Sequence, residues 1–199
     1  MKNRYLYKHR PLEDDFQRKI VADIISGKIF VSASFHFLDP LENLHLTDDG
    51  LKKLDGNFGI VSFTDDPLQP EVWSKYAFWH RGVCFGFCSQ VAPQLRKAKA
   101  VEYVENYSSS EAVSLEEKLL VKPIQWQQEA EWRIVYGERQ KEYNELPTSA
   151  ILEVTFGAAC TDDSEAFVRE KLEEQDLQPT MYRCELANTG GFLTRALIE

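Results

Sequence analysis

The stretch Val83-Cys84-Phe85-Gly86-Phe87-Cys88 decides the fold, because it is apolar at every position. A strand that is apolar on both faces lies at the centre of a sheet, with packed chain above and below it. Strand and helix signals alternate on either side of this stretch, and the predicted strands outnumber the predicted helices. This pattern favours an α+β fold, with a mixed or mainly antiparallel sheet and flanking helices. We expect a single domain over residues 1–199.

The other strands are predicted from alternating apolar and polar positions that are rich in aromatic side chains. The turn sequence Asn188-Thr189-Gly190-Gly191 predicts that the last two strands form a hairpin. The expected strands are Tyr5–His9, Ile29–Phe35, Phe58–Phe63, Ala100–Tyr107, a segment within Ile124–Tyr136, Ala150–Phe156, Met181–Leu186 and Phe192–Ile198.

Helical periodicity predicts four helices. In the first, an apolar face contains Phe16, Ile20 and Ile24, and Gly27 is a suitable stop. Ser114 and Glu117 form a capping-box pattern before a short helix. The expected helices are Leu12–Ser26, a segment from Pro70 through His80 that Gly82 ends, a short helix after Ser114 that Pro123 closes, and Ser164–Glu174, while Asp39–Asn57 is expected to be mostly loop.

Composition excludes several classes of partner. The net charge is −9, which disfavours non-specific binding to nucleic acid because the chain repels phosphates. No apolar run approaches the ~20 residues of a membrane span, and Met1–Arg10 lacks the apolar core of a signal peptide. We therefore expect a cytoplasmic protein without a membrane partner. Its four cysteines are expected to be reduced core residues, and no metal site is predicted.

The segment Glu129-Ala130-Glu131-Trp132-Arg133 has the clearest chemical content. Residues two apart in a strand point the same way, so Glu129, Glu131 and Arg133 should project to one face. Two carboxylates about 7 Å apart at Cα can share a sugar, a metal or a cation, and their repulsion can raise one pKa. Glu131 and Glu129 are therefore candidate catalytic groups, with His80 assisting. The alternative is an ion pair with Arg133 on a solvent-exposed edge strand.

Arg133 and four further side chains are candidate ligand-binding groups. Trp73 and Tyr76 share a helical face with His80 and offer rings for stacking, although core packing is the alternative. Arg10, or its neighbour His9, ends the first strand and could hold a phosphate or carboxylate. The alternative for Arg10 is a surface position before a turn.

The strand around Ser32-Ala33-Ser34 is also a candidate site. Ser32 and Ser34 lie on one face of the predicted strand and could donate hydrogen bonds to a ligand. The alternative is a half-exposed strand without a ligand.

Several segments together resemble a large bacterial family, domain-of-unknown-function family 2971. The resemblance runs in order from Tyr5 to Tyr136. Its segments are Leu6-Tyr7-Lys8-His9-Arg10, Phe30-Val31-Ser32-Ala33-Ser34, Phe37-Leu38-Asp39-Pro40-Leu41-Glu42, Val61-Ser62-Phe63-Thr64-Asp65-Asp66-Pro67, Trp73-Ser74-Lys75-Tyr76-Ala77, His80-Arg81-Gly82-Val83-Cys84-Phe85-Gly86-Phe87 and Glu129-Ala130-Glu131-Trp132-Arg133. It implies a bacterial, cytoplasmic α+β protein of unknown activity, found in some cases in toxin or phage-defence contexts.

The order of three short elements is also similar to that of ADP-ribosyltransferases: Arg10 or His9, then Ser32-Ala33-Ser34, then Glu129-Ala130-Glu131. This similarity implies that NAD is the substrate. Arg10 or His9 would contact its phosphates or ribose, and Ser32 would help to fix the nicotinamide ribose. Glu131 would bind a ribose hydroxyl and stabilise positive charge at the anomeric carbon.

Three functional hypotheses follow for this chain. The first is an NAD-dependent ADP-ribosyltransferase or NAD hydrolase that acts on a nucleotide-like ligand. The second is a non-catalytic binding or regulatory domain in which Glu131 and Arg133 form a structural pair. The third is hydrolysis of a glycosidic or phosphoester bond by the two carboxylates with assistance from His80. The sequence names no protein partner.

Overall fold

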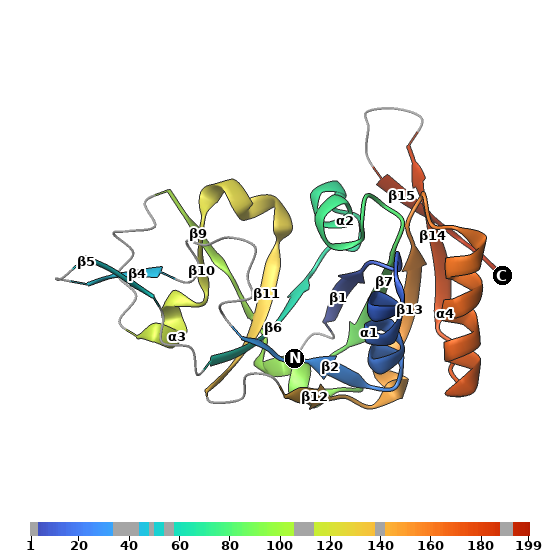
Figure 1. Cartoon of the computed structure of the whole chain (residues 1–199), viewed down its shortest axis with the longest axis horizontal. Helices are drawn as coiled ribbons and strands as arrows, with labels where there is room; N and C mark the ends of the chain where they lie inside the picture. The colour runs from blue at the N-terminus through green and yellow to red at the C-terminus, as the bar shows by residue number, and fades with distance from the viewer. Residues whose placement is uncertain are drawn as a thin grey trace. The chain divides into compact units, whose positions relative to one another are not determined.

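The computed structural model describes residues 4–33, 44–47, 50–53, 58–105, 114–137, 142–187 and 193–199 (Figure 1). The chain divides into two compact units. Unit 1 comprises Met1–Ile29, Phe63–Arg96 and Glu145–Glu199, and unit 2 comprises Phe30–Ser62 and Lys97–Asn144. Helices and a mixed, mostly antiparallel sheet are both present, which confirms the predicted α+β class.

The described helices are α1 (Asp15–Ile25), α2 (Pro70–Tyr76), α3 (Leu115–Lys118) and α4 (Asp162–Glu174), with 3-10 helices η3 (Pro93–Lys97), η5 (Ile124–Glu129) and η6 (Thr148–Ala150). The described strands are β1 (Tyr5–Arg10), β2 (Lys28–Phe30), β3 (Ser32–Ala33), β4 (Leu44–Thr47), β5 (Gly50–Lys53), β6 (Phe58–Thr64), β7 (Val83–Cys88), β8 (Lys99–Ala100), β9 (Glu102–Val104), β10 (Val121–Pro123), β11 (Glu131–Gly137), β12 (Tyr143–Glu145), β13 (Ile151–Phe156), β14 (Thr180–Leu186) and β15 (Leu193–Leu197).

The sheet of unit 1 is built around β7, as its apolar sequence predicts. In the order β15-β14-β13-β7-β1, β7 pairs antiparallel with both of its neighbours, and all six of its residues are buried. Strands β13 and β14 are parallel, whereas β14 and β15 form the expected antiparallel pair. The turn predicted at 188–191 lies outside the described residues. A continuous apolar run therefore marked the central strand correctly.

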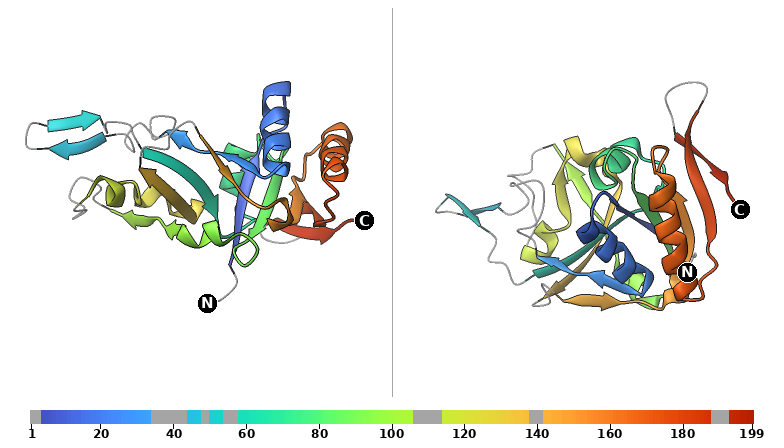
Figure 2. Two further views of the ribbon diagram at one scale, coloured as in Figure 1. Left: turned by 90° about the horizontal axis from the view of Figure 1, so that it is seen from below. Right: turned by 45° about the vertical axis from the view of Figure 1, so that its right-hand side comes forward.

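Helices α1 and α4 lie side by side in unit 1 (Figure 2). Asp14 caps α1 by accepting a hydrogen bond from the Gln17 amide at 2.7 Å, and Gly27 ends it with a left-handed φ of 82°. The apolar face of α1 is buried through Val21, Ile24 and Ile25, but Phe16 is 67% exposed. The prediction that Phe16 belongs to the core face is therefore wrong, because the buried face begins after the first turn.

Trp73 of α2 and the C-cap residue Ala77 belong to one buried cluster with Tyr7 and Cys84 from the sheet of unit 1. The helix ends at Tyr76, six residues before the predicted stop at Gly82. Residues 77–81 form turns instead, so the expectation that His80 lies on this helix is wrong. Three left-handed residues after Ala77 end the helical path.

In unit 2, β3 and β11 both pair with β6, and β11 also pairs antiparallel with β8. Strand β9 runs parallel to β10. The capping box is confirmed, since the amides and side chains of Ser114 and Glu117 bond reciprocally at 3.0 and 3.2 Å. The following helix stops at Lys118, however, and Val121–Pro123 is a strand.

Two predicted strands are shorter or divided. The Ile29–Phe35 prediction becomes β2 and β3 with a break at Val31, while Ser34 and Phe35 lie outside the described residues. The Ala100–Tyr107 prediction becomes β8 and β9 with a break at Val101.

Two other expectations concern membranes and thiols. Within the described part of the chain, no helix is both long and apolar enough to cross a membrane. All four cysteines are buried free thiols, which confirms their assignment to the core; they are Cys84, Cys88, Cys160 and Cys184.

Candidate functional site

Glu129 and Glu131 reach the same place from different elements. Glu129 is the last residue of η5, and Ala130 then adopts a left-handed φ of 44° before β11 begins at Glu131. The prediction that Glu129 and Glu131 lie on one strand is therefore wrong. The left-handed residue turns the chain between them, so that both carboxylates still converge on one partner, Lys122.

Lys122 on β10 joins the two carboxylates. Its Nζ donates hydrogen bonds to Glu129 Oε2 at 2.8 Å and to Glu131 Oε2 at 2.9 Å. The ammonium also lies 5.3 Å from the centre of the Trp126 ring. We call Lys122, Glu129, Glu131 and Arg133 the charged cluster.

Arg133 completes the charged cluster. Its Nε and Nη2 donate to the two oxygens of Glu131 at 2.7 and 2.9 Å, and its Nη1 donates to the Leu119 carbonyl at 2.7 Å. The Tyr103 hydroxyl accepts a hydrogen bond from the Glu131 amide at 2.8 Å. This bidentate geometry fixes both the guanidinium and the carboxylate plane.

The charged cluster is neutral as a whole and closed to solvent. The exposed fractions of Lys122, Glu129, Glu131 and Arg133 are 3%, 4%, 8% and 2%. Burial alone would raise the pKa of Glu131, but the charges of Arg133 and Lys122 outweigh burial and lower that pKa to about 2. Glu131 is therefore ionised at neutral pH and has no proton to donate. The effect is opposite to the mutual repulsion of carboxylates expected from the sequence.

Lys122 is the member of the charged cluster that sequence reasoning missed. A signal was present, because Lys122 interrupts the apolar run Leu119-Leu120-Val121-Lys122-Pro123-Ile124. A lysine in an apolar strand is buried with its neighbours, and a buried ammonium requires carboxylate partners. The two nearby glutamates were the available candidates.

A second group of predicted residues surrounds Trp73 in unit 1. Trp73 is fully buried, and its Nε1 donates to the Pro67 carbonyl at 2.7 Å. The His9 ring meets it edge-on at 4.7 Å, and the His80 ring stacks on it at 6.1 Å with an interplanar angle of 10°. The indole thus packs between two imidazoles inside the protein.

The two histidines of this group are held in the neutral form. Burial lowers the pKa of His9 to about 3 and also lowers the pKa of His80. His9 Nε2 lies 3.4 Å from the Pro67 carbonyl, and His80 Nε2 lies 3.4 Å from the Ser74 hydroxyl. The Nδ1 atoms of both rings are buried without a hydrogen-bond partner.

His80 ends a left-handed turn formed by Phe78, Trp79 and His80, whose φ angles are 45°, 56° and 65°. Each such residue costs about 1–2 kcal/mol relative to a right-handed conformation. Backbone hydrogen bonds hold the turn in place, including Trp79 N–H to the Ser74 carbonyl at 3.1 Å and Ala159 N–H to the His80 carbonyl at 2.9 Å. The surrounding structure therefore imposes the strained conformation.

Arg10 differs from every cation of the charged cluster. It is half-buried at the end of β1, its Nε is screened from solvent, and that Nε has no hydrogen-bond partner. Among the described residues of unit 1, no carboxylate pairs with it. Burial lowers the pKa of its guanidinium to about 10. Since successive strand residues point to opposite faces, Arg10 and His9 cannot both face one ligand.

The remaining candidates are Tyr76 and Ser32. Tyr76 is the last residue of α2 and is half-buried, and Ser32 on β3 is half-buried opposite Ile60. Ser34 lies outside the described residues. The candidates belong to different compact units: Arg10, His9, Trp73, Tyr76 and His80 to unit 1, and Ser32, Glu129, Glu131 and Arg133 to unit 2.

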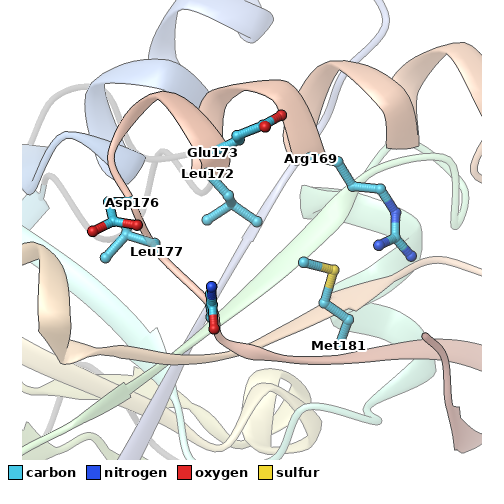
Figure 3. Close-up of a pocket in the computed structure, with 7 residues that line it drawn as sticks. Arg169, Leu172, Glu173, Asp176, Leu177 and Met181 are labelled. Atoms are coloured by element: carbon cyan, nitrogen blue, oxygen red, sulfur yellow. The ribbon is translucent and has the colours of Figure 1, made fainter.

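Unit 1 also has a surface hollow of about 260 Å³ at the C-terminal end of α4 (Figure 3). The Leu172 and Met181 side chains point toward one another across it. Its lining residues are Arg169, Leu172, Glu173, Asp176, Leu177, Gln178 and Met181. We call this feature the α4 hollow.

Comparison of the chain with protein-family models, with curated proteins and with solved structures finds no match in any of the three. The resemblances to domain-of-unknown-function family 2971 and to ADP-ribosyltransferases therefore stay predictions. In the described part of the chain, no group of three or more His, Cys, Asp or Glu side chains is arranged to hold a metal ion.

Proposed function

We propose that this protein is a non-catalytic binding domain for a small anionic ligand of the nucleotide type, and that Arg10 binds a phosphate of that ligand. One observation carries the proposal: the Arg10 Nε is buried without a hydrogen-bond partner. A buried guanidinium N–H without a hydrogen-bond acceptor is costly, and a bound anion would remove that cost. Guanidinium groups match phosphate geometry well.

The charged cluster supports a non-catalytic function. A general acid would need a raised pKa, and a nucleophile or a charge stabiliser would need access to a substrate. Glu131 has a lowered pKa and is 8% exposed, and both of its oxygens accept hydrogen bonds from Arg133 and Lys122. These properties suit a structural ion cluster better than the carboxylate of an NAD-dependent transferase or of a glycosidic hydrolase.

The test is to titrate the protein with ADP, NAD and inorganic phosphate by isothermal titration calorimetry at low salt. We expect ADP or NAD to bind, and Arg10→Gln to weaken that binding by about 10-fold or more, which is the usual effect of losing a hydrogen bond to a charged group. Arg4→Gln, which removes an exposed arginine of the same unit, is the matched control and should bind normally. Failure of all three compounds to bind, or equal weakening by both variants, contradicts the proposal.

Nicotinamide release from NAD tests the enzymatic alternative in the same samples. We expect no turnover above background in the wild type or in Glu131→Gln. Turnover by the wild type that is lost in a folded Glu131→Gln variant would establish the transferase or NAD hydrolase hypothesis in place of ours.

A further inference from the structure

We propose that this protein associates with a second copy of itself, with Trp79 of one copy entering the α4 hollow of the other. This inference goes beyond ligand binding and uses residues other than Arg10, so either proposal can fail without the other.

The left-handed turn presents aromatic side chains to solvent in a fixed position. Trp79 is 70% exposed and Phe78 is 39% exposed. The Arg81 guanidinium lies 5.7 Å from the centre of the Phe78 ring. Tryptophan and arginine are the residue types that most often dominate the binding energy of protein interfaces. Because the backbone of the turn is already held by hydrogen bonds, little conformational freedom is lost on association.

The α4 hollow has the size and lining to accept one large aromatic side chain. Leu172 forms its buried floor at 1% exposed, and Leu177 and Met181 are half-buried beside it (Figure 3). Its volume of about 260 Å³ is below the ~300–1,000 Å³ of typical small-molecule pockets. An indole is small enough to fit on this apolar lining, whereas the hollow is too small to enclose a nucleotide.

Charge complementarity favours the turn as the occupant. Glu173 and Asp176 are exposed at the rim of the hollow, and no ion pair to either is found among the described residues. The third charged lining residue, Arg169, already donates to Glu165 at 2.8 Å and to the Glu199 carbonyl at 2.9 Å. The rim is therefore acidic, and it suits the exposed Arg81, which is likewise without a carboxylate partner in the described part of the chain.

The Trp79 side chain cannot fill the hollow of its own chain. The left-handed turn is tied to the start of α4, since Ala159 N–H donates to the His80 carbonyl. The hollow lies at the other end of α4, whose 13 residues span about 20 Å. The indole that enters it must therefore come from another copy. A reciprocal dimer and a head-to-tail chain both satisfy this contact.

Sedimentation velocity over a range of protein concentrations tests the proposal, with circular dichroism to verify folding. We expect the wild type to self-associate, Trp79→Ala to weaken association by about 30-fold or more, and Met181→Glu to do the same by placing a carboxylate in the hollow. Phe16→Ala, which removes another exposed aromatic ring, should leave association unchanged.

Mixing the two defective variants gives the sharpest result. Trp79→Ala retains an intact hollow and Met181→Glu retains an intact turn, so a mixed pair keeps one contact between Trp79 and the α4 hollow, and we expect the two variants to pair with each other more tightly than either pairs with itself. A wild type that stays monomeric at every concentration, a Trp79→Ala variant that associates normally, or a mixture that pairs no more tightly than either variant alone would each overturn the proposal.

Discussion

Arg133 of unit 2 and Arg10 of unit 1 are both arginines at strand positions, yet their surroundings are opposite. Arg133 donates to both oxygens of Glu131 and to the Leu119 carbonyl, whereas the Arg10 Nε has no partner. The first arrangement is complete without any ligand. The surroundings of Arg10 leave its buried Nε donor without an acceptor, which is the property expected of a group that binds an anion.

The comparison also distinguishes charged residues that have a structural role from a charged residue that is a candidate for ligand binding. In the charged cluster, two cations and two carboxylates neutralise each other in a site closed to solvent. Such clusters contribute little net stability compared with an apolar core, but removal of one member leaves an uncompensated buried charge. The same residue types can therefore mark a structural element in one unit and a candidate binding group in the other.

The largest expected effect is the difference in stability between a variant without the Arg133 guanidinium and a variant without the Arg10 guanidinium. Arg133→Met leaves Glu131 with reduced compensation, so we expect a loss of about 3–5 kcal/mol in the free energy of unfolding. Arg10→Met removes an unpaired group, so we expect no loss or a small gain. Urea unfolding of the ligand-free proteins at pH 7 measures both. Equal destabilisation by the two substitutions would abolish the distinction between the two regions.

The pH dependence of stability provides a second, smaller effect. The pKa of Glu131 is lowered from 4.5 to about 2 in the folded state. Its stabilisation is therefore complete above about pH 4.5 and is lost as the pH falls through about 2, for a total of about 3 kcal/mol. Urea unfolding between pH 7 and pH 2.5 should show this loss in the wild type, and Glu131→Gln should show a flatter profile below pH 4.5.

His9 of unit 1 should act in a different pH window. Burial lowers its pKa from 6.5 to about 3, so the unfolded chain binds a proton that the folded chain excludes. Stability should therefore begin to fall at about pH 6.5 and continue to fall until about pH 3, and His9→Gln should remove that part of the profile. The two windows overlap below about pH 4.5, so the range between pH 6.5 and 4.5 distinguishes them: if His9→Gln leaves that range unchanged, or Glu131→Gln alters it, the assignment of the two windows is wrong.

The smallest effect concerns the left-handed turn. At Trp79, where φ is 56°, glycine avoids the steric cost that alanine retains. We expect Trp79→Gly to be more stable than Trp79→Ala by roughly 0.5–1 kcal/mol. Lys75→Gly and Lys75→Ala in α2 are the matched controls, and there glycine should be the less stable by about 1 kcal/mol. Thermal unfolding of the four variants compares the two positions.

Local sequence determined the elements whose cause is local. The apolar run at Val83–Cys88 identified the central strand, Ser114 with Glu117 identified a helix start, and Gly27 identified a helix end. Each of these follows from the chemistry of a few adjacent residues, such as continuous burial, reciprocal capping or tolerance of positive φ. An ion pair of Glu131 or Glu129 with Arg133 was one of the alternatives that the sequence left open, on a solvent-exposed edge strand; the structure pairs Glu131 with Arg133, but buried and on a strand with a neighbour on each side.

Only the tertiary structure decided which charges are compensated. Positive φ angles occur at Ala130 and in the left-handed turn, but no glycine stands at these positions to indicate them. Glu129 and His80 were therefore assigned to the wrong elements. Lys122 donates a hydrogen bond to Glu131 from a different strand, and the periodicity of a single strand cannot predict that contact. The sequence did not show that the Arg10 Nε is buried without a hydrogen-bond partner or that Arg133 is buried, because the surroundings of a charge are set by where other strands bring their side chains.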